Sequence, residues 1–335
     1  ANWFKTGGSP GDRFGYAVFT AGDVNGDGFS DVVVGAPTDS SAGNAYVYHG
    51  SASGLSGTSN WNVSGSPIAK FGFSVATAGD FNGDGYSDVI IGAVGISNGQ
   101  AFVFSGSSAG LSANSVWSVT SDGSAVALGF SVCTAGDVNG DGYSDVIIGA
   151  PLYDGGQTDE GKCYAYLGSA SGISATAIWA EESDHTGGQF GISVSTAGDM
   201  NGDGYADVIA GGNYLDNGQL DEGRALVYLG YSGGLRTTAE VIYENNQGFS
   251  QFGYSVATAG DINGDGFSDV ICGAYNYDNP SSNEGAAFVY LGSAIGMSAS
   301  SNWNSEGNQD GALFGYSVST AVSYTHLTLP TNREV

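Results

Sequence analysis

Asp, Asn, Asp and Asp occupy positions 1, 3, 5 and 9 of the stretch DVNGDGFSD, which begins at Asp23. These side chains and the backbone carbonyl at position 7 can converge on one cation if the loop curls. Gly26 and Gly28 permit the curl, because glycine adopts positive φ without strain. Carboxylate, amide and carbonyl oxygens with no His or Cys nearby favour calcium over zinc or copper. The stretch therefore predicts a calcium-binding loop.

The same pattern occurs five times, with first aspartates at Asp23, Asp80, Asp137, Asp199 and Asp261, so the repeat is 57 or 62 residues long. Repeats of this length indicate a repeat architecture. We predict about five structural calcium sites, one per loop. Their predicted ligands, in which the aromatic residue at position 7 contributes its carbonyl, are Asp23, Asn25, Asp27, Phe29, Asp31; Asp80, Asn82, Asp84, Tyr86, Asp88; Asp137, Asn139, Asp141, Tyr143, Asp145; Asp199, Asn201, Asp203, Tyr205, Asp207; and Asp261, Asn263, Asp265, Phe267, Asp269.

Three other interpretations of the loops are an EF-hand, a metal-free turn and a catalytic metal site. An EF-hand loop needs a bidentate Glu at position 12 and a helix on each side, whereas position 12 is here Val34, Ile91, Ile148, Ala210 or Cys272. A metal-free turn stays open, although three like charges in each loop would repel one another without a cation. A catalytic metal usually has a single site with an open position, so five equivalent loops favour a structural ion.

Each repeat has room for four short strands and no helix. In the second repeat the expected strands are 71–79, before the loop, then 87–93, 100–106 and the Trp-bearing segment 115–120. The second strand is apolar throughout, which is typical of a strand that is buried on both faces. Four-stranded units in tandem predict an all-β chain folded as a β-propeller, with a solenoid of stacked hairpins as the alternative.

Two short motifs accompany the strands. A Phe-Gly pair opens four of the five complete repeats and the segment after the fifth, and Gly-Ala-Pro follows the loop at 35–37 and 149–151. These motifs resemble FG-GAP repeats, the blades of the integrin alpha-subunit head and of many bacterial secreted proteins, and the resemblance covers residues 1 to about 321. It implies that each aspartate loop closes the hairpin between the first two strands of a blade and binds calcium. The third repeat departs from the pattern, with Leu128 in place of Phe, and three repeats lack the Pro.

The repeats divide the chain into a propeller at 1–321 and a tail at 322–335, which has no repeat counterpart and is interpreted as non-native. Integrin-like heads close with seven blades, so the resemblance implies a fragment of a larger, bacterial-type secreted or surface protein. The expected segments are 1–13 as the last strand of a preceding blade, complete blades near 14–70, 71–127, 128–189, 190–251 and 252–313, and the start of a sixth at 314–321.

The loops between the second and third strands lie on the face opposite the aspartate loops, because strand direction alternates. They are longer in the last three complete repeats and combine Tyr with acids. In integrin-type heads the corresponding face meets the ligand and the partner subunit, so the resemblance implies a protein or glycan ligand here. Ordinary solvated loops are the alternative. The candidate ligand-face residues are Tyr153, Asp154, Glu160, Tyr214, Asp216, Glu222, Tyr277, Asp278 and Glu284.

Charge and composition exclude several classes of function. Seven Lys and Arg against 34 Asp and Glu give a net charge of -27, which disfavours nucleic acid as a partner. No apolar run approaches the roughly 18 residues of a membrane helix, so direct membrane insertion is not expected. Cys133, Cys163 and Cys272 occupy positions that are small core residues in sister repeats, and no disulfide is expected between Cys133 and Cys163.

No group of residues indicates catalysis. The G-x-S-x-G match at 106–110 lies in a repeated turn and lacks the strand-turn-helix setting of a nucleophile. His49 and His185 have no repeated partner, so neither is expected to act as an acid or base. We predict no catalytic or organic-cofactor residues and a calcium-binding, extracellular or cell-surface adhesion or ligand-binding module. The alternatives are the non-catalytic propeller of a larger secreted hydrolase or phospholipase-like enzyme, and a structural spacer.

Overall fold

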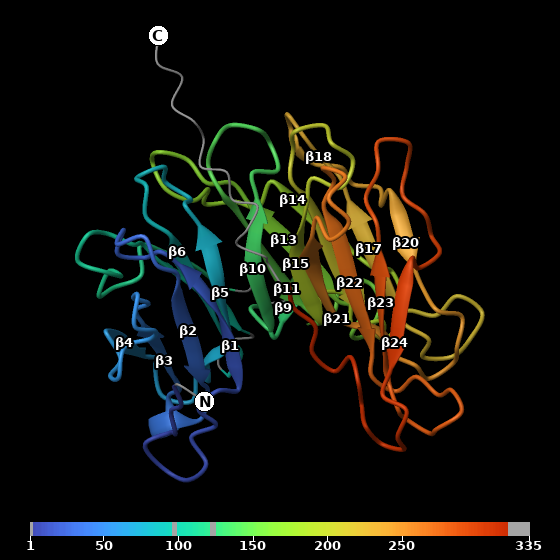
Figure 1. Ribbon diagram of the computed structural model, residues 1–335, viewed down its shortest axis with the longest axis horizontal. Coiled ribbons are helices and arrows are strands. Elements are labelled where there is room, and N and C mark those ends of the chain that lie inside the picture. Colours follow the sequence, from blue (N-terminus) through green and yellow to red (C-terminus); the bar gives the residue numbers. More distant parts are fainter. Residues whose placement is uncertain (1–2, 96–98, 121–124, 321–335) are drawn as a thin grey trace.

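The computed structural model describes residues 3–95, 99–120 and 125–320. Five four-stranded antiparallel sheets follow one another along these residues, and within each the strand order follows the chain. Figure 1 shows them in sequence, from the blue first sheet to the red last one. The only helix in the described part is the single turn η1 (Asp39–Ser41). The predicted all-β fold is confirmed, and each sheet is a blade.

Each blade is built from strands of about five residues. The strands of the five blades in order are β1 (Ala17–Gly22), β2 (Asp31–Ala36), β3 (Asn44–Tyr48), β4 (Trp61–Ser64); β5 (Phe71–Gly79), β6 (Asp88–Ala93), β7 (Gln100–Phe104), β8 (Trp117–Thr120); β10 (Ser131–Gly136), β11 (Asp145–Ala150), β13 (Lys162–Tyr166), β14 (Trp179–Glu182); β15 (Ser193–Gly198), β16 (Asp207–Gly212), β17 (Arg224–Tyr228), β20 (Val241–Tyr243); and β21 (Phe252–Gly260), β22 (Asp269–Ala274), β23 (Ala286–Tyr290), β24 (Trp303–Glu306). Two short pairs add β9 (Ala125–Val126) with β12 (Leu152–Tyr153), and β18 (Gly230–Tyr231) with β19 (Gly234–Leu235).

The second strand of each blade is the centre of the core. Every residue of β6, β11 and β16 is buried, although a strand with one wet face would alternate apolar and polar residues. Blades pack on both sides of these strands, so no position faces water. The three cysteines are also free and buried, as the sequence predicted.

The first strands of successive blades pack against one another, from β1 to β5, β10, β15 and β21. The residue after the Phe-Gly or Leu-Gly pair lies along this inner row in blades 1 to 4, and it is aromatic in blades 1 to 3. The ring centroid of Phe73 is 5.0 Å from that of Tyr16 and 4.9 Å from that of Phe130. These residues, with Ile192 of blade 4, line a cavity of about 270 Å³ between the inner strands. The blades are therefore arranged around a common axis.

The two glycines of the Phe-Gly and Gly-Ala-Pro motifs meet between blades. A Cβ on Gly35 of blade 1 would lie 2.0 Å from the carbonyl oxygen of Gly72 in blade 2, and the same clash recurs at Gly92 with Gly129. Within blade 1, the N–H of Gly15 donates to the carbonyl of Gly35 at 3.0 Å. The motifs are thus the positions where backbone packs directly on backbone, which only glycine allows.

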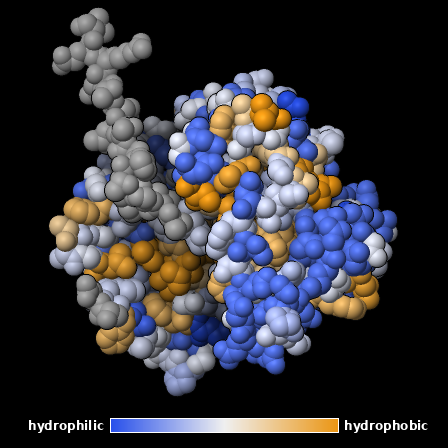
Figure 2. Space-filling model, turned by 45° about the vertical axis from the view of Figure 1, so that its right-hand side comes forward, coloured by the Kyte–Doolittle hydropathy of each residue, from blue (hydrophilic) through white to orange (hydrophobic). Residues whose placement is uncertain are grey.

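The tryptophan on the fourth strand links one blade to the next. Nε1 of Trp61 donates to the carbonyl oxygen of Ser112 at 2.9 Å, and Trp3 makes the same bond to Ser56 at 2.9 Å. Trp303 of blade 5 is instead 51 % exposed, and Val18 on β1 is 57 % exposed. Figure 2 shows apolar side chains reaching one face of the molecule between larger hydrophilic areas.

The predicted tail at 322–335 lies outside the described residues, and the proposed division of the chain into a propeller and a tail stays a prediction. Within the part of the chain that the structure describes, no helix has the length and apolar character needed to cross a bilayer.

Candidate metal loops and candidate ligand face

The first aspartate of each loop holds the loop closed. In blade 1, Oδ1 of Asp23 accepts hydrogen bonds from the N–H groups of Gly26 and Asp27 at 2.7 and 3.1 Å, and Oδ2 accepts from Gly28 at 2.7 Å. Gly26 and Gly28 have φ of +72° and +87°, the region that glycine adopts without strain. The loop therefore curls where the sequence predicts it.

The side chains at positions 3 and 5 are hydrogen-bonded to each other inside the same curled loop. Nδ2 of Asn25 donates to Oδ2 of Asp27 at 3.0 Å, and Oδ1 of Asn25 accepts from the N–H of Asp27 at 3.1 Å. The other four loops repeat these contacts with closely similar distances, at Asn82–Asp84, Asn139–Asp141, Asn201–Asp203 and Asn263–Asp265. The structure thus brings positions 1, 3 and 5 together in all five loops.

Position 9 has a structural role that the sequence analysis missed. Asp31 is completely buried. Its Oδ2 accepts from the N–H of Val24 in the loop at 3.0 Å, and its Oδ1 accepts from the N–H of Gly50 at the end of the third strand at 2.7 Å. Asp88, Asp145, Asp207 and Asp269 do the same in their blades. The sequence signal for this role is an aspartate at the start of an otherwise apolar strand.

Burial makes the position 9 carboxylates hard to ionise without a cation. It raises the pKa of Asp88, Asp145 and Asp207 to about 7, and it also raises the pKa of Asp31 and Asp269. Two backbone N–H donors oppose this shift, while the carboxylates at positions 1 and 5 add to it in blades 2 to 5. Each nine-residue loop contains three carboxylates and no Lys, Arg or His of its own.

The loop oxygens fit a hard cation in type, although the described residues contain no group of three acidic, His or Cys side chains already set at metal-binding distances. A carboxylate has about four lone-pair sites, and Asp23 uses three of them for backbone N–H groups. The aspartate, asparagine and carbonyl oxygens are the ligands that calcium takes in flexible geometry. Side-chain rotations would be needed to bring them onto one ion.

Neighbouring loops contact one another directly. A Cβ on Gly26 would lie 2.6 Å from the ring of Tyr86, the position 7 residue of blade 2. The turn between the third and fourth strands lies at the same end, where Nδ1 of His49 is 3.1 Å from Nδ2 of Asn25. The loops therefore form one row along one face.

Two sequence profiles of this repeat type match the chain. The FG-GAP repeat matches residues 128–166, 190–228 and 252–290, and the FG-GAP-like repeat matches 23–91. The chain belongs to the FG-GAP repeat family. The fold and the resemblance inferred from the Phe-Gly and Gly-Ala-Pro motifs are therefore confirmed.

Several integrin alpha subunits are similar to this FG-GAP chain. It is 28 % identical to integrin alpha-5 of Xenopus laevis over 239 residues, which is 68 % of this chain and 22 % of that protein. It is 31 % identical to integrin alpha-V of Gallus gallus over 224 residues, 62 % of this chain and 20 % of that protein. It is 36 % identical to integrin alpha-7 of Homo sapiens over 145 residues, 41 % of this chain and 12 % of that protein. The chain spans about a fifth of the length of the first two relatives.

The opposite end of this FG-GAP propeller carries the candidate ligand face, and the structure divides its residues into two groups. Asp154 and Asp278 are exposed, and Asp216, Tyr214 and Tyr277 are half-buried. The others are buried, which differs from the expectation that every one of these residues faces a ligand. They are Tyr153, at 8 % exposure, and Glu160, Glu222 and Glu284, at 0 %.

The aspartates of this face close their own loops. Oδ1 of Asp154 accepts from the N–H of Asp159 at 2.7 Å, and Oδ1 of Asp216 accepts from the N–H of Asp221 at 2.6 Å. Asp278 makes the same bond to Asn283. In each case the bond uses one oxygen of the carboxylate, Oδ1.

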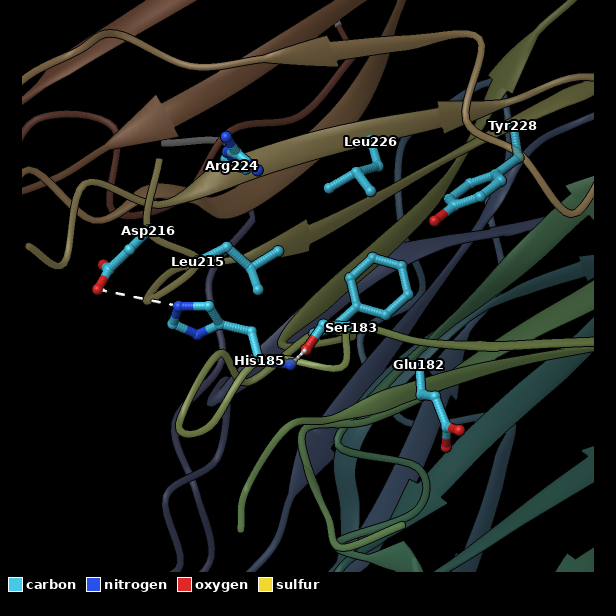
Figure 3. Close-up of a pocket in the computed structure, with 9 residues that line it drawn as sticks. Glu182, Ser183, His185, Leu215, Asp216, Arg224, Leu226 and Tyr228 are labelled. Carbon is cyan, nitrogen blue, oxygen red and sulfur yellow. Dashed lines mark hydrogen bonds and ion pairs between the residues drawn. The ribbon is translucent and has the colours of Figure 1, made fainter. Parts of the chain in front are cut away.

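A cavity of about 160 Å³ opens on this face between blades 3 and 4 (Figure 3). Phe190, Leu215 and Leu226 supply its apolar lining. At its rim, the ring of His185 points toward Asp216, with Nε2 3.9 Å from Oδ2. This partner of His185 was not predicted from the repeats, because Asp216 belongs to the next blade. The cavity combines an apolar floor with charged groups, as small-molecule and side-chain pockets do.

Proposed function

We propose that the five aspartate loops are structural calcium sites and that the chain is a non-catalytic, calcium-stabilised binding module. The observation that carries this proposal is the repeated geometry: every loop curls in the same way and brings three carboxylates into one nine-residue segment, one of them completely buried, and no basic residue stands among the loop positions. A bound cation would favour the ionised form of the buried aspartate, whose pKa burial raises. All of the donors are oxygens, which suits calcium.

Calcium at extracellular concentration is the ion that such loops would meet. Extracellular calcium modules bind with dissociation constants of about 0.1 to 1 mM. At about 1 mM calcium, each such site stabilises the fold by roughly 0.4 to 1.4 kcal/mol. Five sites together would therefore contribute a substantial part of the stability of an ordinary domain, which is about 5 to 15 kcal/mol. This supports an extracellular or cell-surface location.

The module is proposed to act in adhesion or ligand binding, with a protein or glycan ligand on the face opposite the calcium loops. The integrin alpha relatives are subunits of adhesion receptors rather than enzymes, which supports this class of function. Exposed Asp154 and Asp278 and the cavity beside Asp216 supply acidic and apolar groups on that face. A basic or hydroxyl-bearing group of a ligand would suit them.

Calorimetric titration of the chelated full chain with calcium, together with thermal melts, tests the metal sites. We expect about five equivalent ions and a melting temperature that rises by more than 5 °C at 1 mM calcium, by the usual relation between stability and melting temperature. Replacing Asp23 by Asn should remove one ion. A titration with no heat and no shift in melting temperature would exclude the calcium proposal.

Peptide and glycan arrays probed with the calcium-loaded chain test the ligand face. A hit should weaken at least tenfold in Asp216→Asn, at the rim of the cavity, and stay unchanged in Ser53→Ala, which lies in an exposed turn at the calcium-loop end. A hit lost equally in both variants would place the binding surface elsewhere. Arrays without any hit would favour the spacer alternative.

A further inference from the structure

Three loops on the face opposite the aspartate loops each bury a glutamate. Glu160, Glu222 and Glu284 occupy the same position in blades 3, 4 and 5, and all three have 0 % exposure. A second glutamate comes from the end of the fourth strand in each blade, at Glu182, Glu244 and Glu306. A buried carboxylate beside another acid needs hydrogen-bond donors and positive charge.

Blade 3 supplies both hydrogen-bond donors and a positive charge for its glutamates. Oε1 of Glu160 accepts from the N–H groups of Gly155 and Gly156, at 2.5 and 2.7 Å. Nζ of Lys162 lies 3.5 Å from Oε2 of Glu182 and 4.5 Å from the ring centroid of Tyr153. One lysine therefore contacts both the second glutamate and the tyrosine of the loop.

Blade 4 uses an arginine in the same place. Nε of Arg224 is 3.0 Å from Oε2 of Glu244. The backbone N–H of Asn217 donates to Oε1 of Glu222. Burial raises the pKa of Glu222, and the charge of Arg224 acts to lower it, which places that charge near both glutamates.

In the part of the chain that the structure describes, blade 5 has neither a basic side chain at this position nor a hydrogen-bond donor to its buried glutamate. Ala286 replaces the lysine and arginine, and Pro280, which has no N–H, replaces the donor Gly156. Neither Oε1 nor Oε2 of Glu284 has a hydrogen-bond partner among the described residues. No Lys, Arg or His occurs anywhere between residues 252 and 313. Glu284 is thus a buried carboxylate with both oxygens unpartnered.

Several contacts indicate that the two glutamates of blade 5 face one space. Burial raises the pKa of Tyr277, and the charges of Glu306 and Glu284 raise it further, so both carboxylates act on the same side chain. Nδ2 of Asn279, in the loop above Glu284, donates to Oε1 and Oε2 of Glu306 at 3.0 and 3.1 Å. In blade 3, one oxygen of Glu160 and one of Glu182 lie 2.7 Å from the position that a Cβ on Gly155 would take, and Asn279 is the residue at that position in blade 5.

We propose that blade 5 binds a divalent cation between Glu284 and Glu306, where blades 3 and 4 place a basic side chain. Two carboxylates at a site without His or Cys favour calcium or magnesium. The site lies at the opposite end of the blade from the aspartate loop Asp261–Asp269, so it is additional to the five repeat sites. A small ion fits better than a partner's lysine, because Glu284 is inaccessible to solvent.

Counting bound calcium in paired variants of the full chain tests this site. Glu284→Gln keeps the shape and removes the charge, and we expect it to bind one calcium ion fewer than the wild type. Ala286→Lys keeps both carboxylates and supplies the cation of blade 3, so it should also lose one ion and should melt at a higher temperature than the wild type in chelator. Glu222→Gln in blade 4 is the matched control and should leave the ion count unchanged.

Glu306→Gln provides a second test at the half-buried partner, and it avoids any substitution at a fully buried position. It should also remove one ion. Equal ion counts in the wild type, Glu284→Gln and Glu306→Gln would overturn the proposal. The comparison does not depend on the five aspartate loops: if those bound no calcium, the wild type would bind one ion and the variants none.

Discussion

The backbone N–H of Ser87 in blade 2 donates a 3.0 Å hydrogen bond to the carbonyl oxygen of Asp23 in blade 1. Oγ of the same serine accepts from the N–H of Asp23 at 3.2 Å. The first residue of one aspartate loop is therefore bonded to the eighth residue of the next. Ser144 makes the same two bonds with Asp80, and the N–H of Ser268 donates to the carbonyl oxygen of Asp199. Each loop is thus part of the boundary between two blades as well as a candidate metal site.

This arrangement predicts unequal effects of alanine at two glycines of one loop. Gly26 and Gly28 both have positive φ, which costs alanine about 1–2 kcal/mol. A Cβ on Gly26 would also lie 2.6 Å from the ring of Tyr86, whereas a Cβ on Gly28 would meet nothing within 4 Å. We expect Gly26→Ala to lower the free energy of unfolding by about 2–4 kcal/mol and Gly28→Ala by about 1–2 kcal/mol. Urea denaturation in calcium measures both, and equal losses would contradict the contact between loops.

The buried position 9 aspartates predict opposite pH responses with and without metal. Burial raises the pKa of Asp88, Asp145 and Asp207 to about 7 in the folded chain, above the value of about 3.9 in an unfolded chain. Without metal, their contribution to stability is fully present below the unfolded pKa and is lost as pH rises through about 7. The chelated chain should therefore melt at a higher temperature at pH 5 than at pH 8. Calcium binds the ionised form, so its stabilising shift should be larger at pH 8.

The control for this pH response is the triple variant Asp88→Asn, Asp145→Asn and Asp207→Asn, in which these groups cannot titrate. Its chelated form should show a smaller difference in melting temperature between pH 5 and pH 8 than the wild type. If the two proteins showed the same difference, other carboxylates would account for the pH response.

Local pattern was enough to predict the strands and the loops. The apolar run of β6, the alternate acids from Asp23 and the glycines at positions 4 and 6 each act within a few neighbouring residues. The repeat then supplied the architecture, because five similar units must bury similar faces. These features could be predicted because they depend on short spacings within one unit.

Contacts between units could not be predicted in the same way. Asp216 meets His185 only because blades 3 and 4 pack side by side. Glu160 and Glu284 looked like surface acids in polar loops, yet the loops fold over them and bury them. The dual role of Asp31 depends on Gly50, at a distance of 19 residues. One sequence gives no direct signal for such distant pairs.

The glycine that follows the aspartate loop should be intolerant of any side chain. A Cβ on Gly35 would lie 2.0 Å from the backbone oxygen of Gly72, which cannot rotate away as a side chain could. We expect Gly35→Ala to cost about 3 kcal/mol or more. Gly57→Ala is the control, because Gly57 has no neighbour within 4 Å and its φ is not positive. Chemical denaturation should leave the control within about 0.5 kcal/mol of the wild type.

The tryptophans on the fourth strands predict the strength of one contact between blades. Trp61 is 9 % exposed, and its Nε1 donates to the carbonyl of Ser112 in the next blade at 2.9 Å. Trp61→Phe keeps an aromatic ring but removes the donor, so it should lower the free energy of unfolding by about 1–3 kcal/mol. Trp303 is 51 % exposed, and Trp303→Phe should change it by less than about 0.5 kcal/mol. If the two variants lost equal stability in calcium, the bond between Trp61 and Ser112 would not hold blades 1 and 2 together.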